Sequence, residues 1–270
     1  MNPGKTRLAT VLIGSAIAAF AAGSLQAQTT PAPAAPTAPP AAAASAEAPA
    51  SPLSFNVALA SQYIFRGLTQ TDYKPAIQGG ADFAHDSGFY VGVWASNISW
   101  LRDYQISSGR VEVDLYGGYK KSVGDWTGDI GFLRYEYVGN VQSGATNPDT
   151  NEVYAALSYK FITFKWSHAI TNAFGTPGSK ASYYADLTAA VPVADTWTLM
   201  AHIGRQHFHG PSSELASYFD YKLEIAKDFG NGLSAGIGAT ATDANREFYT
   251  PPDKRSSAKD TGYVFAKYTF

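Results

Sequence analysis

Apolar and polar residues alternate with a period of two along most of the chain after residue 53. In residues 110–115 every second residue is Val or Leu, and the residues between them are Arg, Glu and Asp. Residues 219–225 repeat the pattern, with aromatic or aliphatic residues on one phase and Asp220, Lys222 and Glu224 on the other. Because successive side chains of a strand point to opposite faces, the pattern predicts strands with one apolar and one charged face.

Twelve segments carry enough of this pattern to be strands. They are expected at residues 55–68, 75–84, 89–98, 110–121, 126–138, 151–160, 162–172, 181–191, 196–207, 218–228, 233–243 and 261–270. Most run for about ten residues or more, which exceeds the length of roughly five or six that is usual in soluble sheets and suits a tilted membrane-crossing strand. In residues 126–138 the apolar phase changes between Phe132 and Leu133, which predicts a bulge.

The connections between these segments alternate in length. Short turns are expected at 85–88, 121–125, 160–161, 192–196 and 228–232, and longer loops at 70–74, 98–109, 139–150, 172–180, 208–217 and 243–260. This alternation, with both termini on the short side, is typical of outer-membrane barrels. A soluble β-protein is disfavoured because the second face of each strand is too charged to form another packed core. The predicted fold is all-β, a single transmembrane antiparallel β-barrel of about 12 strands.

The two ends of the chain indicate the same location. In residues 1–27 two basic residues precede an apolar run and small residues lead to Ala27, as in a cleavable secretory signal peptide. Residues 28–53 are mostly Ala and Pro and are expected to form a disordered linker, leaving residues 54–270 for the barrel. Tyr268 and Phe270 resemble the C-terminal assembly signal of outer-membrane barrels, although Phe265 stands where a Gly is often found. We expect insertion by the barrel-assembly machinery into the outer-membrane lipid of a Gram-negative bacterium, with both termini periplasmic.

Composition and motifs argue against several functions. The formal net charge of −2 becomes −4 without the signal peptide, which does not suggest a nucleic-acid partner. The chain has no cysteine and therefore no disulfide, thiol nucleophile or Cys-ligated zinc site. His207 and His209 share a strand face but lack an evident third ligand, and the adjacent Ser167 and His168 point to opposite faces. We predict neither enzymatic activity nor a cofactor.

The charged face of the wall is expected to line the lumen. By the period-two rule this face holds Arg66, Gln78, Asp82, Arg110, Glu112, Asp114, Glu152, Lys160, Asp186, His202, Gln206, Asp220, Lys222 and Glu224. These groups are mixed in sign, so they either line an aqueous path or pair across strands and brace a closed barrel. Glycines on the same phase favour the open form, because they leave parts of the wall without side chains. The glycines are Gly80, Gly92, Gly118, Gly204, Gly236 and Gly238.

Three stretches near the start of the barrel carry a family resemblance. They are SQYIFRGLTQTD at residues 61–72, KPAIQGGAD at 74–82 and SGFYVGVWASN at 87–97. They resemble the opening of the proteobacterial TorF family of porins, formerly a domain of unknown function. The resemblance implies a signal peptide, an outer-membrane barrel and a porin role.

Two functions follow from these expectations. The first is a porin-like channel for passive diffusion of small hydrophilic solutes or ions, driven by their gradients alone. The alternative is a non-conducting structural or surface-interaction barrel that uses its long extracellular loops. The sequence does not determine the oligomeric state or the solute.

Overall fold

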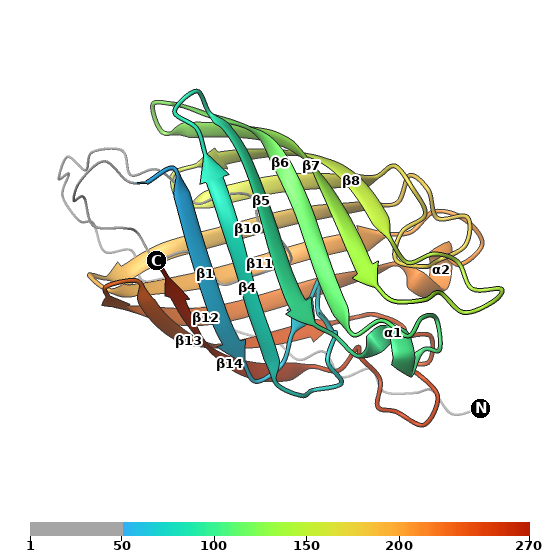
Figure 1. Cartoon of the computed structure of the whole chain (residues 1–270). Coiled ribbons are helices and arrows are strands. Elements are labelled where there is room, and N and C mark those ends of the chain that lie inside the picture. Colours follow the sequence, from blue (N-terminus) through green and yellow to red (C-terminus); the bar gives the residue numbers. More distant parts are fainter. Residues whose placement is uncertain (1–50) are drawn as a thin grey trace, which may run out of the picture.

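The computed structural model describes residues 51–270, and within them twelve strands close into one barrel (Figure 1). Every strand pairs with its neighbours in antiparallel orientation and in chain order, and the last strand returns to the first. The predicted fold class is confirmed. The predicted signal peptide and nearly all of the predicted linker lie outside the described residues.

The wall strands cover most of the chain. They are β1 (Leu53–Ala60), β4 (Ala76–Ala84), β5 (Phe89–Asn97), β6 (Val111–Val123), β7 (Trp126–Val138), β8 (Thr150–Tyr159), β9 (Ile162–Ala169), β10 (Tyr183–Ala194), β11 (Trp197–His207), β12 (Tyr218–Gly230), β13 (Leu233–Thr242) and β14 (Thr261–Thr269). The remaining elements are the two-residue strands β2 (Ile64–Phe65) and β3 (Leu68–Thr69), which pair only with each other, and the one-turn helices α1 (Trp100–Asp103) and α2 (Ser213–Ala216).

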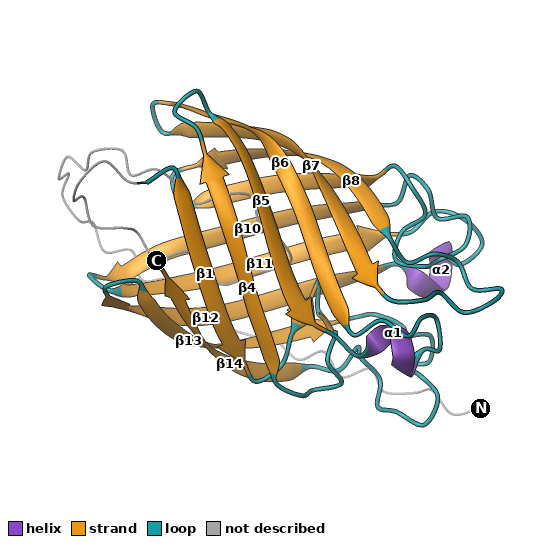
Figure 2. Ribbon diagram, in the orientation of Figure 1, coloured by secondary structure: helices purple, strands orange, loops and turns teal. Residues whose placement is uncertain are grey.

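The two ends of the barrel differ in the length of their connections. The six long connections, with α1 and α2, lie at one end, here called the loop end (Figure 2). The short turns and the C-terminus lie at the other, here called the turn end. Neither short helix in residues 51–270 has the length and apolar character needed to cross a membrane.

The barrel closes between its first and last strands. β1 and β14 pair from Asn56 with Thr269 to Ala60 with Phe265. Beyond this register, Phe55 and Phe270 exchange two backbone hydrogen bonds of 2.8 and 2.9 Å, and their rings stack 5.8 Å apart. Closure leaves no strand edge unpaired, which is required where no water can satisfy backbone groups.

The outer face of the wall is apolar. Ile77, Ile130 and Ile237, on three different strands, are each about 60% exposed, at 64%, 61% and 58%. Aromatic pairs lie near the turn end of this face, including Trp126 with Tyr159, whose ring centroids are 4.6 Å apart. So much exposed apolar surface is unfavourable in water and favourable against lipid, and the aromatic pairs occupy positions of an interfacial girdle.

The inward glycines do not leave the lumen open, contrary to the expectation from the sequence. A Cβ atom on Gly92 would meet the ring of Tyr116, and a Cβ atom on Gly204 would meet the ring of Tyr184. Each of these tyrosines lies on the neighbouring strand and leans across the glycine backbone. The other inward glycines are likewise covered by side chains of adjacent strands. The missing side chains therefore make room for large rings inside the wall.

Two predicted strands needed correction. The first wall strand ends at Ala60, eight residues earlier than expected, because residues 61–75 turn into the barrel. The bulge expected in residues 126–138 is absent, since β7 keeps its register against β6 and β8 throughout. Leu133 and Tyr135 simply point inward, into an aromatic cluster around the incoming segment.

Candidate functional site: the barrel interior

The interior at the loop end is filled by residues 61–75, here called the inner segment. It leaves β1, forms the β2–β3 hairpin and returns to β4, so that it lies within the loop end of the barrel (Figure 1, blue). Its turn places Arg66 and Gly67 at φ of 45° and 78°, and a Cβ atom on Gly67 would collide with Asp220 of β12. Glycine permits both the backbone angle and this close approach.

Arg66 is the main anchor of the inner segment. Its guanidinium donates to both carboxylate oxygens of Glu152 on β8, at 3.0 and 2.8 Å, and to the amide oxygen of Gln206 on β11, at 2.7 Å. The guanidinium also lies 4.3 Å from the ring centre of Tyr184. The side chains of Arg66 and Glu152 are only 5% and 2% exposed. A bidentate buried pair of this kind fixes geometry as well as charge.

A second contact joins the inner segment to β6. The Tyr63 hydroxyl donates to Glu112 at 2.9 Å, and the Tyr63 ring packs edge-on against Trp94. Asp114, two residues along the same face, is fully buried. Neither of its carboxylate oxygens has a hydrogen-bond partner among residues 51–270. Two carboxylates therefore share this side of the interior, and one of them is uncompensated.

A third cluster lies on β10, β11 and β12. The His202 ring lies between two carboxylates, with Nδ1 3.3 Å from Asp186 and Nε2 2.8 Å from Asp220. The Tyr184 hydroxyl donates to Asp220 at 2.9 Å and lies 3.0 Å from His202. Lys222 follows on the same face of β12 and is half-buried. This cluster braces three strands from inside.

The interior nearer the turn end is lined by tyrosines and carboxylates. The Tyr90 hydroxyl donates to Asp129 at 2.6 Å, and the Tyr116 hydroxyl donates to Asp82 at 2.5 Å. Lys165 lies 4.1 Å above the ring of Tyr154. Tyrosine hydroxyls thus satisfy carboxylates two strands away, while their rings occupy lumen volume.

Most of the predicted lining residues lie inside the barrel. These are Arg66, Gln78, Asp82, Glu112, Asp114, Glu152, Asp186, His202, Gln206, Asp220, Lys222 and Glu224. Arg110 and Lys160 do not, which corrects the expectation for both. Arg110 is exposed before β6 begins, and Lys160 occupies an exposed turn at φ 52°, where its ammonium lies 3.7 Å from Asp125. The period-two rule fails at such positions because neither residue belongs to a strand.

Sequence reasoning missed several interior residues. Asp129 lies on β7, where a bulge was expected, and Lys165 lies on β9, whose two faces differ little in polarity. The tyrosines that donate to carboxylates were not recognised either, because aromatic residues fit a lipid-facing surface equally well. An inward glycine on the neighbouring strand is the signal that would have identified Tyr116 and Tyr184.

A small cavity of about 30 Å³ lies where Gln62, Gln78 and Tyr263 meet, which is room for one or two water molecules. Residues 51–270 contain no group of three or more His, Asp or Glu side chains arranged to hold a metal ion. The arrangement is that of a polar, largely filled lumen.

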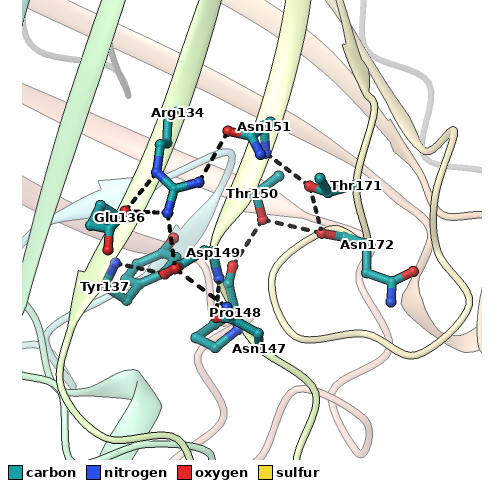
Figure 3. Close-up of polar contacts among 10 residues, drawn as sticks. All are labelled: Arg134, Glu136, Tyr137, Asn147, Pro148, Asp149, Thr150, Asn151, Thr171 and Asn172. Atoms are coloured by element: carbon teal, nitrogen blue, oxygen red, sulfur yellow. Dashed lines mark hydrogen bonds and ion pairs between the residues drawn. The ribbon is translucent and has the colours of Figure 1, made fainter.

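The loop end also carries a polar cluster on its outer rim (Figure 3). Arg134 points outward from β7 and donates to Glu136 at 2.6 Å and to Asp149 at 3.3 Å. Asp149 in turn accepts from the backbone of Tyr137 at 3.0 Å. The outward charge of Arg134 is therefore neutralised by its neighbours.

One protein-family model matches most of the chain. The family model described as a bacterial protein of unknown function (Gcw_chp) matches residues 43–270. The chain belongs to the Gcw_chp family. No curated protein matches the chain in sequence. Since the Gcw_chp match begins before β1 and runs to the last residue, the family covers the whole barrel.

Solved structures place the Gcw_chp fold among outer-membrane barrels. A KdgM porin in complex with disordered oligogalacturonate aligns with a TM-score of 0.51 at 8% identity, over 80% of this chain and 99% of its own. An outer membrane channel from Pseudomonas putida F1 aligns with a TM-score of 0.51 at 11% identity, and the alignment covers 83% of this chain and 96% of the channel. A NanC porin aligns with a TM-score of 0.50 at 10% identity, and the alignment covers 80% of this chain and 98% of the porin. At such identities the likeness establishes the fold, that of porins and channels.

Proposed function

We propose that the protein is a porin-like channel of the outer membrane through which small hydrophilic solutes or ions diffuse passively. The observation that carries the proposal is the two-faced wall, with exposed aliphatic residues outside and ionisable residues inside. A soluble protein would bury the first and expose the second. Solutes would move down their own gradients, so the proposal requires no cofactor and no catalytic group.

The inner segment forms the constriction of this channel. It fills the loop end of the lumen and is tied to β8 and β11 through Arg66, Glu152 and Gln206. A solute would pass beside these groups or displace them. The long loops would face outward from the cell and the short turns and termini would face the periplasm, as in other outer-membrane barrels.

The charge of the interior favours cations over anions. Inward carboxylates outnumber inward Lys and Arg side chains among residues 51–270. A narrow acidic lumen raises the local concentration of cations. The KdgM structure is described with oligogalacturonate, a polyanion. The carboxylate excess in this chain favours a different class of solute.

Ion selectivity in planar bilayers tests the proposal. Lys222 is an inward cation, so Lys222→Glu should shift the reversal potential further toward cation selectivity. Lys160→Glu is the matched control, because Lys160 lies in an exposed turn. Its effect should be much smaller. Equal shifts for the two variants would contradict a path lined by Lys222.

The alternative, a non-conducting structural or surface-interaction barrel, is supported by one specific observation. Tyrosine rings and the inner segment fill much of the lumen, and the cavity beside Gln62 is small. The same recording separates the two functions. Correctly folded protein that never conducts would favour the structural role.

A further inference from the structure

A group of aromatic and basic residues lies on the outer wall at the loop end. This aromatic–basic patch consists of Trp166, His168, Tyr183, Arg205, His207 and His209, on β9, β10, β11 and the residues just after β11. The strand members point outward, because the alternating residues Ser167, Tyr184 and Gln206 are buried inside the barrel.

The rings of the patch form a continuous row. Trp166 stacks on Tyr183 with ring centroids 4.2 Å apart, Tyr183 lies 4.9 Å from His207, and His207 lies 5.0 Å from His209. His168, Tyr183 and His207 are also direct neighbours in the strand register. Such amphipathic rings are typical of the depth at which lipid headgroups meet hydrocarbon.

Arg205 supplies a positive charge that the protein leaves uncompensated. Its guanidinium lies 4.4 Å above the ring of Phe219, and it forms no salt bridge within residues 51–270. Arg134, which points outward from β7 at the same end, is held by Glu136 and Asp149 (Figure 3). At a membrane surface, anionic lipid headgroups attract an Arg side chain whose charge the protein does not pair.

We propose that the aromatic–basic patch binds a phosphorylated glycolipid of the leaflet that surrounds the loop end. Arg205 would pair with a phosphate, for which the planar guanidinium offers two parallel donors. The ring row of Trp166, Tyr183 and His207 would pack against the body of the headgroup. This inference rests on the proposed outer-membrane location, but it does not require that the barrel conducts.

Binding of lipid A to the purified full-length barrel in detergent micelles tests the patch, with native mass spectrometry as the readout. Arg205→Gln should weaken binding about ten-fold, the loss expected for one charge-assisted contact. Arg134→Gln is the matched control, since its charge is already neutralised, and should change binding less than about two-fold. Heat-modifiable migration on gels verifies that each variant is folded.

A second arm uses lipid A from which the phosphates have been removed. Its binding should be weaker, and Arg205→Gln should no longer change it. Equal losses for Arg205→Gln and Arg134→Gln would indicate unspecific charge attraction and overturn the inference, as would unchanged binding to Arg205→Gln. A barrel that binds lipid A through Arg205 but never conducts would disprove only the channel.

Discussion

At the scale of single residues, the buried carboxylates of the interior differ in whether they have a hydrogen-bond partner. Glu152 accepts two hydrogen bonds from Arg66 in a dry environment, whereas Asp114 is buried just as deeply without any such bond. Removing one partner of a buried ion pair leaves the other charge uncompensated, whereas removing an isolated buried charge relieves a desolvation cost. The two carboxylates should therefore respond in opposite ways to neutralisation.

Thermal or denaturant unfolding of the purified barrel tests this contrast. Glu152→Gln should lower the free energy of unfolding by roughly 3–5 kcal/mol, because Arg66 would remain charged and buried. Asp114→Asn also converts a carboxylate to an amide, on β6, two strands from Glu152. It should leave the free energy of unfolding unchanged or raise it. A similar loss for both variants would show that Asp114 also has a favourable partner.

At the scale of elements, the inner segment is held at the rim as well as in the lumen. Asp72 accepts from Lys74 at 3.1 Å and from Lys254 at 3.3 Å, and Lys254 also lies 3.4 Å from Asp103. Partial burial works against the ionised form of Asp72, but the hydrogen bonds from the two lysines outweigh it and lower its pKa. One carboxylate thus joins the inner segment to residues 243–260.

Acid should loosen this attachment. The pKa of Asp72 is lower in the folded protein than its ordinary value of 3.8. The ionised carboxylate therefore stabilises the folded state above about pH 4, and this stabilisation disappears as the pH falls through the lowered pKa. Hydrogen exchange of residues 243–260 between pH 6 and pH 2.5 should show this loss, after correction for the intrinsic exchange rate. In the Asp72→Asn variant, the amides of residues 243–260 should exchange fast at every pH in this range. The Asp125→Asn variant, changed at an exposed turn, should exchange like the wild type. A wild-type protection independent of pH would contradict the role of Asp72.

The last strand provides the element-scale prediction for assembly. Phe270 completes the closure by exchanging backbone hydrogen bonds with Phe55. If the terminal Tyr268 and Phe270 are recognised by the barrel-assembly machinery, Phe270→Glu should sharply reduce folded barrel in the membrane while secretion continues. Phe229→Glu, which changes another exposed aromatic residue at the turn end, is the control. Equal amounts of folded protein in the wild type and the Phe270 variant would count against such recognition.

At the scale of the whole molecule, location follows from the lipid-facing outer surface. The protein should fractionate with the outer membrane, show heat-modifiable migration, and carry a mature N-terminus produced by cleavage after Ala27. An epitope inserted in residues 243–260 should be accessible on intact cells, whereas one at residues 124–125 should not, because these connections lie at opposite ends of the barrel. Recovery from the soluble periplasm would refute the membrane location.

The wall of the barrel follows from local patterns in the sequence. Alternation along each strand and alternation of connection lengths are local properties, so eleven of the twelve wall strands were located closely. Most inward charges followed from the same rule, since a strand turns every second residue to the same face. The rule failed at Arg110 and Lys160, which lie outside the strands.

The filling of the lumen depends instead on contacts between residues far apart in the sequence. Residues 61–68 alternate like a strand, but a pattern of period two does not say whether Tyr63 packs against lipid or, as it does, against β5 and β6 inside the barrel. Arg66 finds Glu152 and Gln206 eighty-six and one hundred and forty residues away, a pairing that no local signal encodes. The same holds for the glycines: a residue without a side chain leaves a space, and its neighbour across the strands decides whether that space is filled.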